Sequence, residues 1–165
     1  MIVKGFKVLN NEQMNNYGVK FEENNIYFVE GKAVFGINGN GIHFCENLED
    51  VFRYSNAKEE EVKVALVMGF GDIATYHDDY YGYYDMHCAS NLYVERILTR
   101  EEIISHMLKL KTEHKIINFL VTFKLMKDEI ELFKNTFKKN LTIMNAIAYY
   151  QEDKKDVYQK IKVRY

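Results

Sequence analysis

The chain has 165 residues, of which 47% are hydrophobic and 15% aromatic, and this composition excludes disorder as its main state. The formal net charge of −2 excludes a basic field of the kind that captures nucleic acid. Two cysteines without a secretory leader argue against a disulfide framework, and no apolar run approaches the ~18 residues that span a bilayer, so we expect a soluble, cytoplasmic protein without a membrane partner.

The first half of the chain has the patterns of β-strands. The strand-like stretches are residues 2–9, 17–21, 26–29, 62–70 and 92–98. Asn-rich and Gly-containing turns separate them, and the stretch 62–70 is the most apolar, so it is predicted to be central. We expect a mostly antiparallel sheet of about five or six strands in residues 1–98.

The second half has the patterns of helices. Thr99 and Glu102 fit a capping box, in which each side chain accepts a hydrogen bond from the other residue's amide. Further helices are predicted at residues 113–126, 128–138, 141–150 and 153–163. The helix predicted at residues 113–126 has apolar side chains on nearly every face around Phe119. Neighbouring helices or another chain must therefore cover it. The predicted fold is α+β, with an α+β domain at residues 1–110 and a helical extension, residues 111–165, packed on it.

The segment GIHFCENLEDVFRY, residues 41–54, combines a strand, a turn and a helix start. On a strand, His43 and Cys45 share one face, and Asn47 is a good helix N-cap. The two side chains are either half-buried packing residues or metal ligands. A zinc site of the Cys2His2 type would consist of His43, Cys45, His87 and Cys88.

Three stretches together resemble a known family: the opening KGFKVL, the hairpin-like residues 17–27, and GIHFCENLEDVFRY. They resemble a poorly characterised family from phages and mobile elements of bacteria. Its members open with Lys-Gly-Phe and carry a Gly-Phe-His-Phe-Cys-Glu-Asn segment. The likeness covers the first third of the chain well and is lost in the C-terminal helices. The resemblance implies a phage or mobile-element origin and no settled activity.

A second resemblance is to the ADP-ribosyltransferase fold, in which a Gly-x-Tyr-Phe strand and a helix ending in Tyr line a nicotinamide pocket. Residues 41–44 and Tyr54 are similar, with His43 in place of the strand Tyr. The resemblance implies NAD as a ligand of Lys4, Gly5, His43, Phe44 and Tyr54. Leu92 stands where that fold has its catalytic Glu, and Glu95 lies on the opposite strand face, so the resemblance implies NAD binding more than transfer chemistry.

Residues 75–88, TYHDDYYGYYDMHC, contain five tyrosines, three aspartates and two histidines. Exposed aromatic side chains are normally scattered, so this density predicts a loop that forms a recognition surface. A loop packed on itself or on the strands is the alternative. The aspartates oppose binding of nucleic acid through this loop. The tyrosines of the predicted surface are Tyr76, Tyr80, Tyr81, Tyr83 and Tyr84.

The sequence shows no intact catalytic set, because G-x-S-x-G, P-loop and H-E-x-x-H patterns are all missing from it. We therefore predict a small binding or interaction protein without a cofactor, whose partner is another protein or a second copy of the chain. An ADP-ribosyltransferase-like NAD-binding protein or enzyme is the alternative. A zinc-stabilised module is the second alternative.

Overall fold

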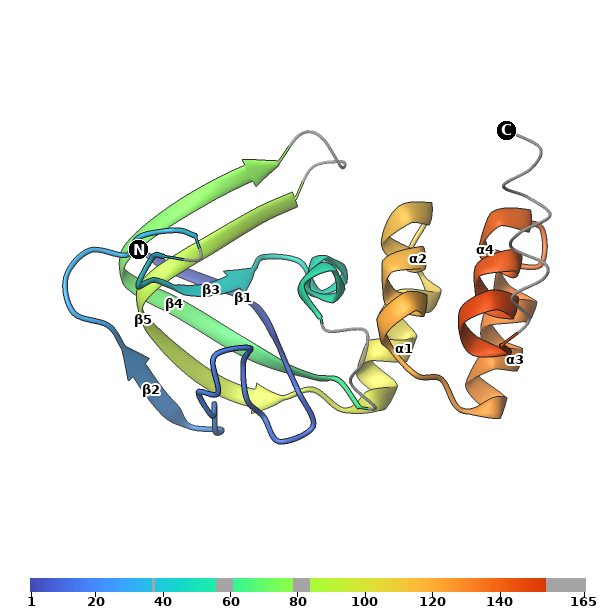
Figure 1. Cartoon of the computed structure of the whole chain (residues 1–165), viewed down its shortest axis with the longest axis horizontal. Helices are drawn as coiled ribbons and strands as arrows, with labels where there is room; N and C mark the ends of the chain where they lie inside the picture. The colour runs from blue at the N-terminus through green and yellow to red at the C-terminus, as the bar shows by residue number, and fades with distance from the viewer. Residues whose placement is uncertain (37, 56–60, 79–83, 154–165) are drawn as a thin grey trace.

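A five-stranded antiparallel sheet precedes a group of helices, which confirms the predicted α+β class. The computed structural model describes residues 1–36, 38–55, 61–78 and 84–153. Figure 1 shows the strands on one side of the molecule and the α-helices on the other. The strands are β1 (Ile2–Leu9), β2 (Asn25–Phe28), β3 (Ile42–Cys45), β4 (Lys63–Asp78) and β5 (Tyr84–Ile97).

Four of the strands close into a ring. The order in the sheet is β2-β5-β3-β1-β4, and β5 also pairs with β4. The ring therefore runs from β1 to β4, β5 and β3 and back to β1. The register of β4 against β5 shifts at two places, Leu66/Val67 and Phe70/Ile73, and such irregularities let long strands bend. β3 pairs with residues 86–89 of β5, and β2 pairs with residues 91–94. One side of the ring is open, because β1 pairs with β3 only at Phe6 and Cys45, and β2 has no described strand partner besides β5.

Phe44 fills the inside of the ring and is 2% exposed. A Cβ atom at Gly5 would lie 2.4 Å from the Cys45 backbone oxygen and 2.7 Å from Phe44 Cδ2, and one at Gly69 would lie 2.5 Å from Phe44 Cε1, so both positions require glycine. These glycines are therefore explained by the close approach of two strands to one large ring. The same core contains Leu9, Phe21, Ala65, Val67, Ala89, Leu92 and Val94.

A second core lies between the outer face of the sheet and the helices. The helical segments are η1 (Leu48–Tyr54), α1 (Arg100–Leu108), α2 (Glu113–Thr122), α3 (Lys127–Thr136), α4 (Leu141–Ala146) and η2 (Ile147–Gln151). Phe119 of α2 is fully buried, with Phe52 of η1 edge-to-face at 4.9 Å and Phe133 of α3 stacked at 5.6 Å between ring centroids. The apolar helix is thus covered by neighbours in the same chain. None of the helices in the described ranges is long and apolar enough to cross a membrane.

The short helix η1, the teal coil in Figure 1, lies between the strands and α2. An ion pair and a hydrogen bond hold it: Asp50 pairs with Lys115 at 2.9 Å, and Glu49 Oε2 lies 2.7 Å from His106 Nε2. Asn47 precedes it as predicted but makes no side-chain cap hydrogen bond to the backbone. The helix has 3-10 geometry, so the expected α-helical start is only approximately right.

Most expectations about single elements are confirmed, including the strand at residues 2–9, and two are wrong. The capping box is present, because the Glu102 amide donates to Thr99 Oγ1 and the Thr99 amide donates to Glu102 Oε1. The strand 42–45 is also present. The strand expected at residues 17–21 is a turn, because Asn15 Oδ1 accepts hydrogen bonds from the amides of Tyr17 and Val19.

The second wrong expectation concerns residues 75–88. Residues 75–78 and 84–88 are not loop, because Thr75–Asp78 extends β4 and Tyr84–Cys88 begins β5, and cross-strand pairs continue to Asp78 and Tyr84. Residues 79–83 lie outside the described ranges. The outer parts of these strands carry polar cross-strand pairs, such as Thr75 with His87. The apolar pattern in the sequence therefore ends before the strands do. The predicted helix 153–163 lies outside the described residues apart from Asp153.

Candidate ligand-binding site

A cavity of about 840 Å³ lies on the open side of the ring. It is lined by β1, β2, β3, η1 and the two long connections between the first three strands. This volume falls in the range of pockets that hold small molecules. Tyr17 and Phe28 line it and are 72% and 74% exposed, so the cavity is bordered by large aromatic side chains that the protein itself does not cover.

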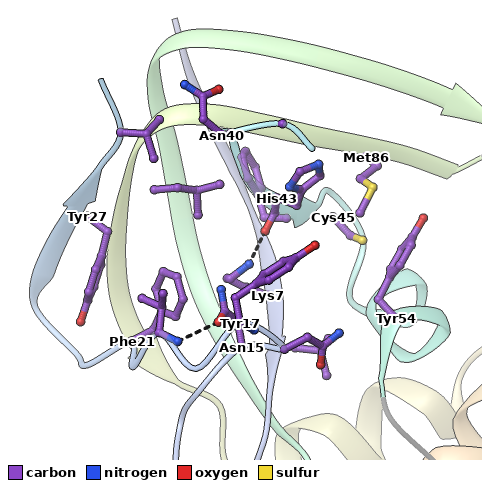
Figure 2. A pocket seen from close by; sticks show the side chains of 18 of the residues that line it. Lys7, Asn15, Tyr17, Phe21, Tyr27, Asn40, His43, Cys45, Tyr54 and Met86 are labelled. Carbon is purple, nitrogen blue, oxygen red and sulfur yellow. Dashed lines mark hydrogen bonds between the residues drawn. The ribbon is translucent and has the colours of Figure 1, made fainter. Parts of the chain in front are cut away.

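Lys7 is the charged residue of the cavity. Its side chain is 9% exposed, and Nζ donates a hydrogen bond of 2.7 Å to the His43 backbone oxygen. The same Nζ lies 5.1 Å from the centre of the Phe21 ring, within range of a cation–π interaction. Figure 2 shows Lys7 pointing toward His43, with Tyr27 and Tyr54 on opposite sides.

The electrostatic environment of Lys7 is unusual for a lysine. Among the described residues, His43 O is the one hydrogen-bond acceptor of Nζ, and the lining contains no Asp or Glu. Burial lowers the pKa of Lys7 from 10.5 to about 8. The amine is therefore mostly charged at neutral pH. Its two remaining N–H groups can donate hydrogen bonds to a ligand oxygen.

His43 lies beside Lys7 in the cavity. Its Nε2 accepts a hydrogen bond of 3.2 Å from the Gly36 amide, so we place the ring proton on Nδ1. Burial, and then the charge of Lys7, lower the pKa of His43, and the ring is neutral at pH 7. The Phe35 ring packs edge-to-face against it at 5.2 Å. The cavity thus holds a cation beside a neutral imidazole, between aromatic walls.

The residues that the NAD expectation named are only partly brought together. His43, Phe44 and Tyr54 all line the cavity. Gly5 is buried against Phe44 and does not line it, and Lys4 is exposed on β1 opposite Met68. Lys7, three residues after Lys4, occupies the cavity instead.

The residues of the expected zinc site do not converge. His43 pairs with Cys88 across β3 and β5, whereas His87 pairs with Phe44 and packs against its ring. In the described ranges no three His, Cys, Asp or Glu side chains gather as metal ligands. Burial raises the pKa of Cys45 to about 12 and also raises that of Cys88, so both thiols are protonated at neutral pH and are poor nucleophiles.

The predicted tyrosine surface is described only in part. Tyr76 lies on β4, is half exposed, and has its ring 6.2 Å from Phe35, which lines the cavity. Tyr84 begins β5. Tyr80, Tyr81 and Tyr83 lie outside the described residues.

A polar network beside this hairpin was not anticipated from the sequence. Thr75 Oγ1 lies 2.8 Å from His87 Nδ1, and His87 Nε2 lies 2.9 Å from Glu46 Oε2. The order hydroxyl, imidazole, carboxylate is also that of catalytic triads. None of the three residues lines the cavity, and they join β4, β5 and the end of β3.

Lys7 is the site residue that the sequence reasoning missed. A signal was present, because Val3, Gly5, Lys7 and Leu9 alternate along β1 and Lys7 is the polar member of the inward set. A charge at an inward strand position marks either a slipped register or a functional group.

The comparison with protein families places the cavity within a known domain family. A family model described as "Domain of unknown function (DUF7666)" matches residues 3–106. No curated protein and no solved structure matches the chain. The matched residues include every residue that lines the cavity. Because the match covers more than half of the sequence, the chain belongs to the DUF7666 family, whose function is unknown, which is consistent with the expected membership of a poorly characterised family.

Proposed function

We propose that this protein binds a small organic anion with an aromatic or apolar body, and that Lys7 is its charge partner. The observation that carries the proposal is a buried amine, with no described carboxylate partner, in an 840 Å³ cavity with aromatic walls. A charged amine is expensive to bury unless it is paired, so a site that keeps one favours an anionic ligand.

The composition of the lining supports the same ligand class. Tyr17, Tyr27 and Phe28 offer flat apolar surfaces for rings. The Asn15 amide nitrogen and the Asn16 amide add neutral hydrogen-bonding groups that can orient polar substituents, whereas the Asn40 amide is bound to Val34 N and Glu30 O.

The proposal is tested with two probes of equal shape, 2-naphthoate and uncharged 2-naphthalenemethanol, by calorimetric titration at pH 7. A charge-assisted hydrogen bond to Lys7 should make naphthoate bind about tenfold or more tightly than the alcohol. In Lys7→Met this preference should vanish.

The matched control is Lys4→Met, which removes an exposed amine from the same strand. It should keep the preference for the anion. Equal affinity of the two probes for the native protein, or an unchanged preference in Lys7→Met, would contradict the proposal.

NAD is a second candidate ligand, because His43, Phe44 and Tyr54 line one cavity together with Lys7. Its phosphates are anionic and its rings suit aromatic walls. The lining has no carboxylate among its described residues, so the candidate concerns binding and not transfer. At 100 times its dissociation constant NAD would add ~2.7 kcal/mol to the free energy of unfolding, and Tyr54→Leu should reduce that gain. An unchanged melting temperature at millimolar NAD would rule against it.

We also propose an origin in a phage or mobile element, which the likeness of KGFKVL and GIHFCENLEDVFRY to such a family supports. Sequencing of the flanking genes tests it. Neighbours that encode phage structural or integration proteins are expected, and a conserved metabolic operon around the gene would speak against this origin.

A further inference from the structure

We propose that the Lys7 amine is a nucleophile that condenses with a carbonyl group of the bound ligand, so that the cavity takes aldehydes as covalent imine adducts. This inference rests on the proposed function, because it names a reactive group in a ligand of the same cavity. It goes beyond simple charge pairing, because it assigns a bond-forming role to Nζ.

The surroundings of Nζ favour this reaction. The amine is held in position by the His43 oxygen at 2.7 Å and by the Phe21 ring at 5.1 Å. The described lining has no carboxylate that would keep it as an ammonium ion. Because burial brings the pKa of Lys7 to about 8, about half of the molecules carry the free amine at that pH. Lysines in apolar pockets are activated as Schiff-base nucleophiles in this way.

The reaction balances without an oxidant or reductant. The nitrogen lone pair attacks the carbonyl carbon, a C–N bond forms, and the π electrons move to oxygen, which takes up a proton. The carbinolamine then loses this hydroxyl group as water, and the nitrogen gives up its remaining protons to leave a neutral imine. The two protons that leave the nitrogen reach the departing oxygen through water, which can enter the cavity beside the exposed Tyr17 and Phe28.

Lys4 provides a matched comparison within the same molecule. It lies three residues before Lys7 on β1 but is exposed and does not line the cavity. Burial in the cavity is therefore the main difference between the two amines. The ratio of labelling at the two residues therefore measures the effect of the cavity on the amine.

The experiment treats the full chain with 2-naphthaldehyde and sodium cyanoborohydride at pH 8, and maps the reduced adducts by peptide mass spectrometry. We expect Lys7 to be labelled about ten times faster than Lys4 or more. Excess 2-naphthoate should slow labelling of Lys7 and leave Lys4 unchanged. The inference is overturned if Lys7 is labelled no faster than Lys4, or if naphthoate leaves the rate at Lys7 unchanged while it binds.

A Lys7→Arg variant should lose this one adduct and keep the others. If that variant does not fold, the Lys7 to Lys4 ratio in the native protein still decides. Failure of this inference is separable from failure of the proposed function. Naphthoate binding without selective labelling overturns the imine and leaves the binding proposal standing. Selective labelling without naphthoate binding supports the nucleophile and contradicts the anion selectivity.

Discussion

At the scale of single residues, Lys7 is held in a state that is unfavourable for folding. An ammonium group loses hydration on burial, and here one backbone oxygen and one aromatic ring replace it. The lowered pKa of Lys7 reflects this penalty, because the folded state favours the neutral amine over the charged one. Residues that reduce stability in this way are found where function requires them.

Because of this penalty, the free energy of unfolding should depend on pH through Lys7. The unfolded chain keeps the Lys7 proton up to its ordinary pKa of 10.5, and the folded chain only to about 8. Between these pH values the unfolded state binds more protons, so stability rises with pH across that window, by up to about 3 kcal/mol from this residue.

Urea denaturation from pH 7 to 10.5 measures this effect as the difference between the native protein and Lys7→Met. The subtraction removes the contributions of groups that do not interact with Lys7, and it retains the coupling of Lys7 to Cys45 and His43. Lys4→Met is the control and should keep the native profile. Parallel profiles for the native protein and Lys7→Met would show that Lys7 carries no such penalty.

The sequence could locate the family segment but not the buried amine. His43, Phe44 and Tyr54 were predicted as ligand residues from a short motif, and they share a cavity because residues 41–54 form a strand followed directly by a helix. The burial of Lys7 depends on the connection 10–24, which brings Phe21 over it from outside the strand. Local patterns do not specify such a contact.

At the scale of elements, the ring of strands is built around one phenylalanine. β1 and β4 approach the Phe44 ring so closely that Gly5 and Gly69 face it. A strand glycine ordinarily weakens a sheet, and here it allows close packing against a neighbour. β3, which carries Phe44, His43 and Cys45, is thereby fixed next to the cavity.

A double-mutant cycle that enlarges Gly69 and shortens Phe44 tests this packing. Gly69→Ala should lower the free energy of unfolding by about 1–3 kcal/mol, because its Cβ would overlap Phe44 Cε1 and Cζ. Phe44→Leu removes these two atoms, so the double variant should lose less stability than the sum of the two single losses, as a thermal or urea denaturation cycle can measure. Strict additivity would mean that the two residues do not meet.

Elements with local signals were predictable, and those set by long-range pairing were not. The capping box of Thr99 and Glu102 lies within four residues, and it was found. The alternation at residues 17–21 also predicts a strand. The chain turns there instead, because the amides of Tyr17 and Val19 donate hydrogen bonds to the Asn15 side chain. The pattern of residues 75–88 predicts a loop, because the strand pairs there, such as Thr75 with His87, are polar.

At the scale of the whole molecule, η1 connects the sheet to the helices. Its Phe52 packs on α2, and its Tyr54 and Val51 line the cavity. Asp50 and Lys115 form an ion pair whose side chains are 4% and 13% exposed. Burial raises the pKa of Asp50 even with Lys115 beside it, so the carboxylate depends on its partner.

Removal of one member of this pair should loosen the junction. Lys115→Met leaves a buried carboxylate without its cation and should cost about 3 kcal/mol in urea denaturation. Adding Asp50→Asn should recover much of that loss. The exposed Lys111→Met is the control and should change stability little. A loss in Lys115→Met no larger than in this control would mean that the pair does not hold η1.

The central claim, that Lys7 pairs with a bound anion, is tested most directly by counting protons on binding. Naphthoate is titrated calorimetrically at pH 8 in two buffers of different ionisation enthalpy. Because Lys7 is half protonated near this pH and a bound anion favours its charged form, we predict an uptake of about half a proton per ligand, and none in Lys7→Met. Binding without proton uptake, or an equal uptake in both proteins, would contradict the claim.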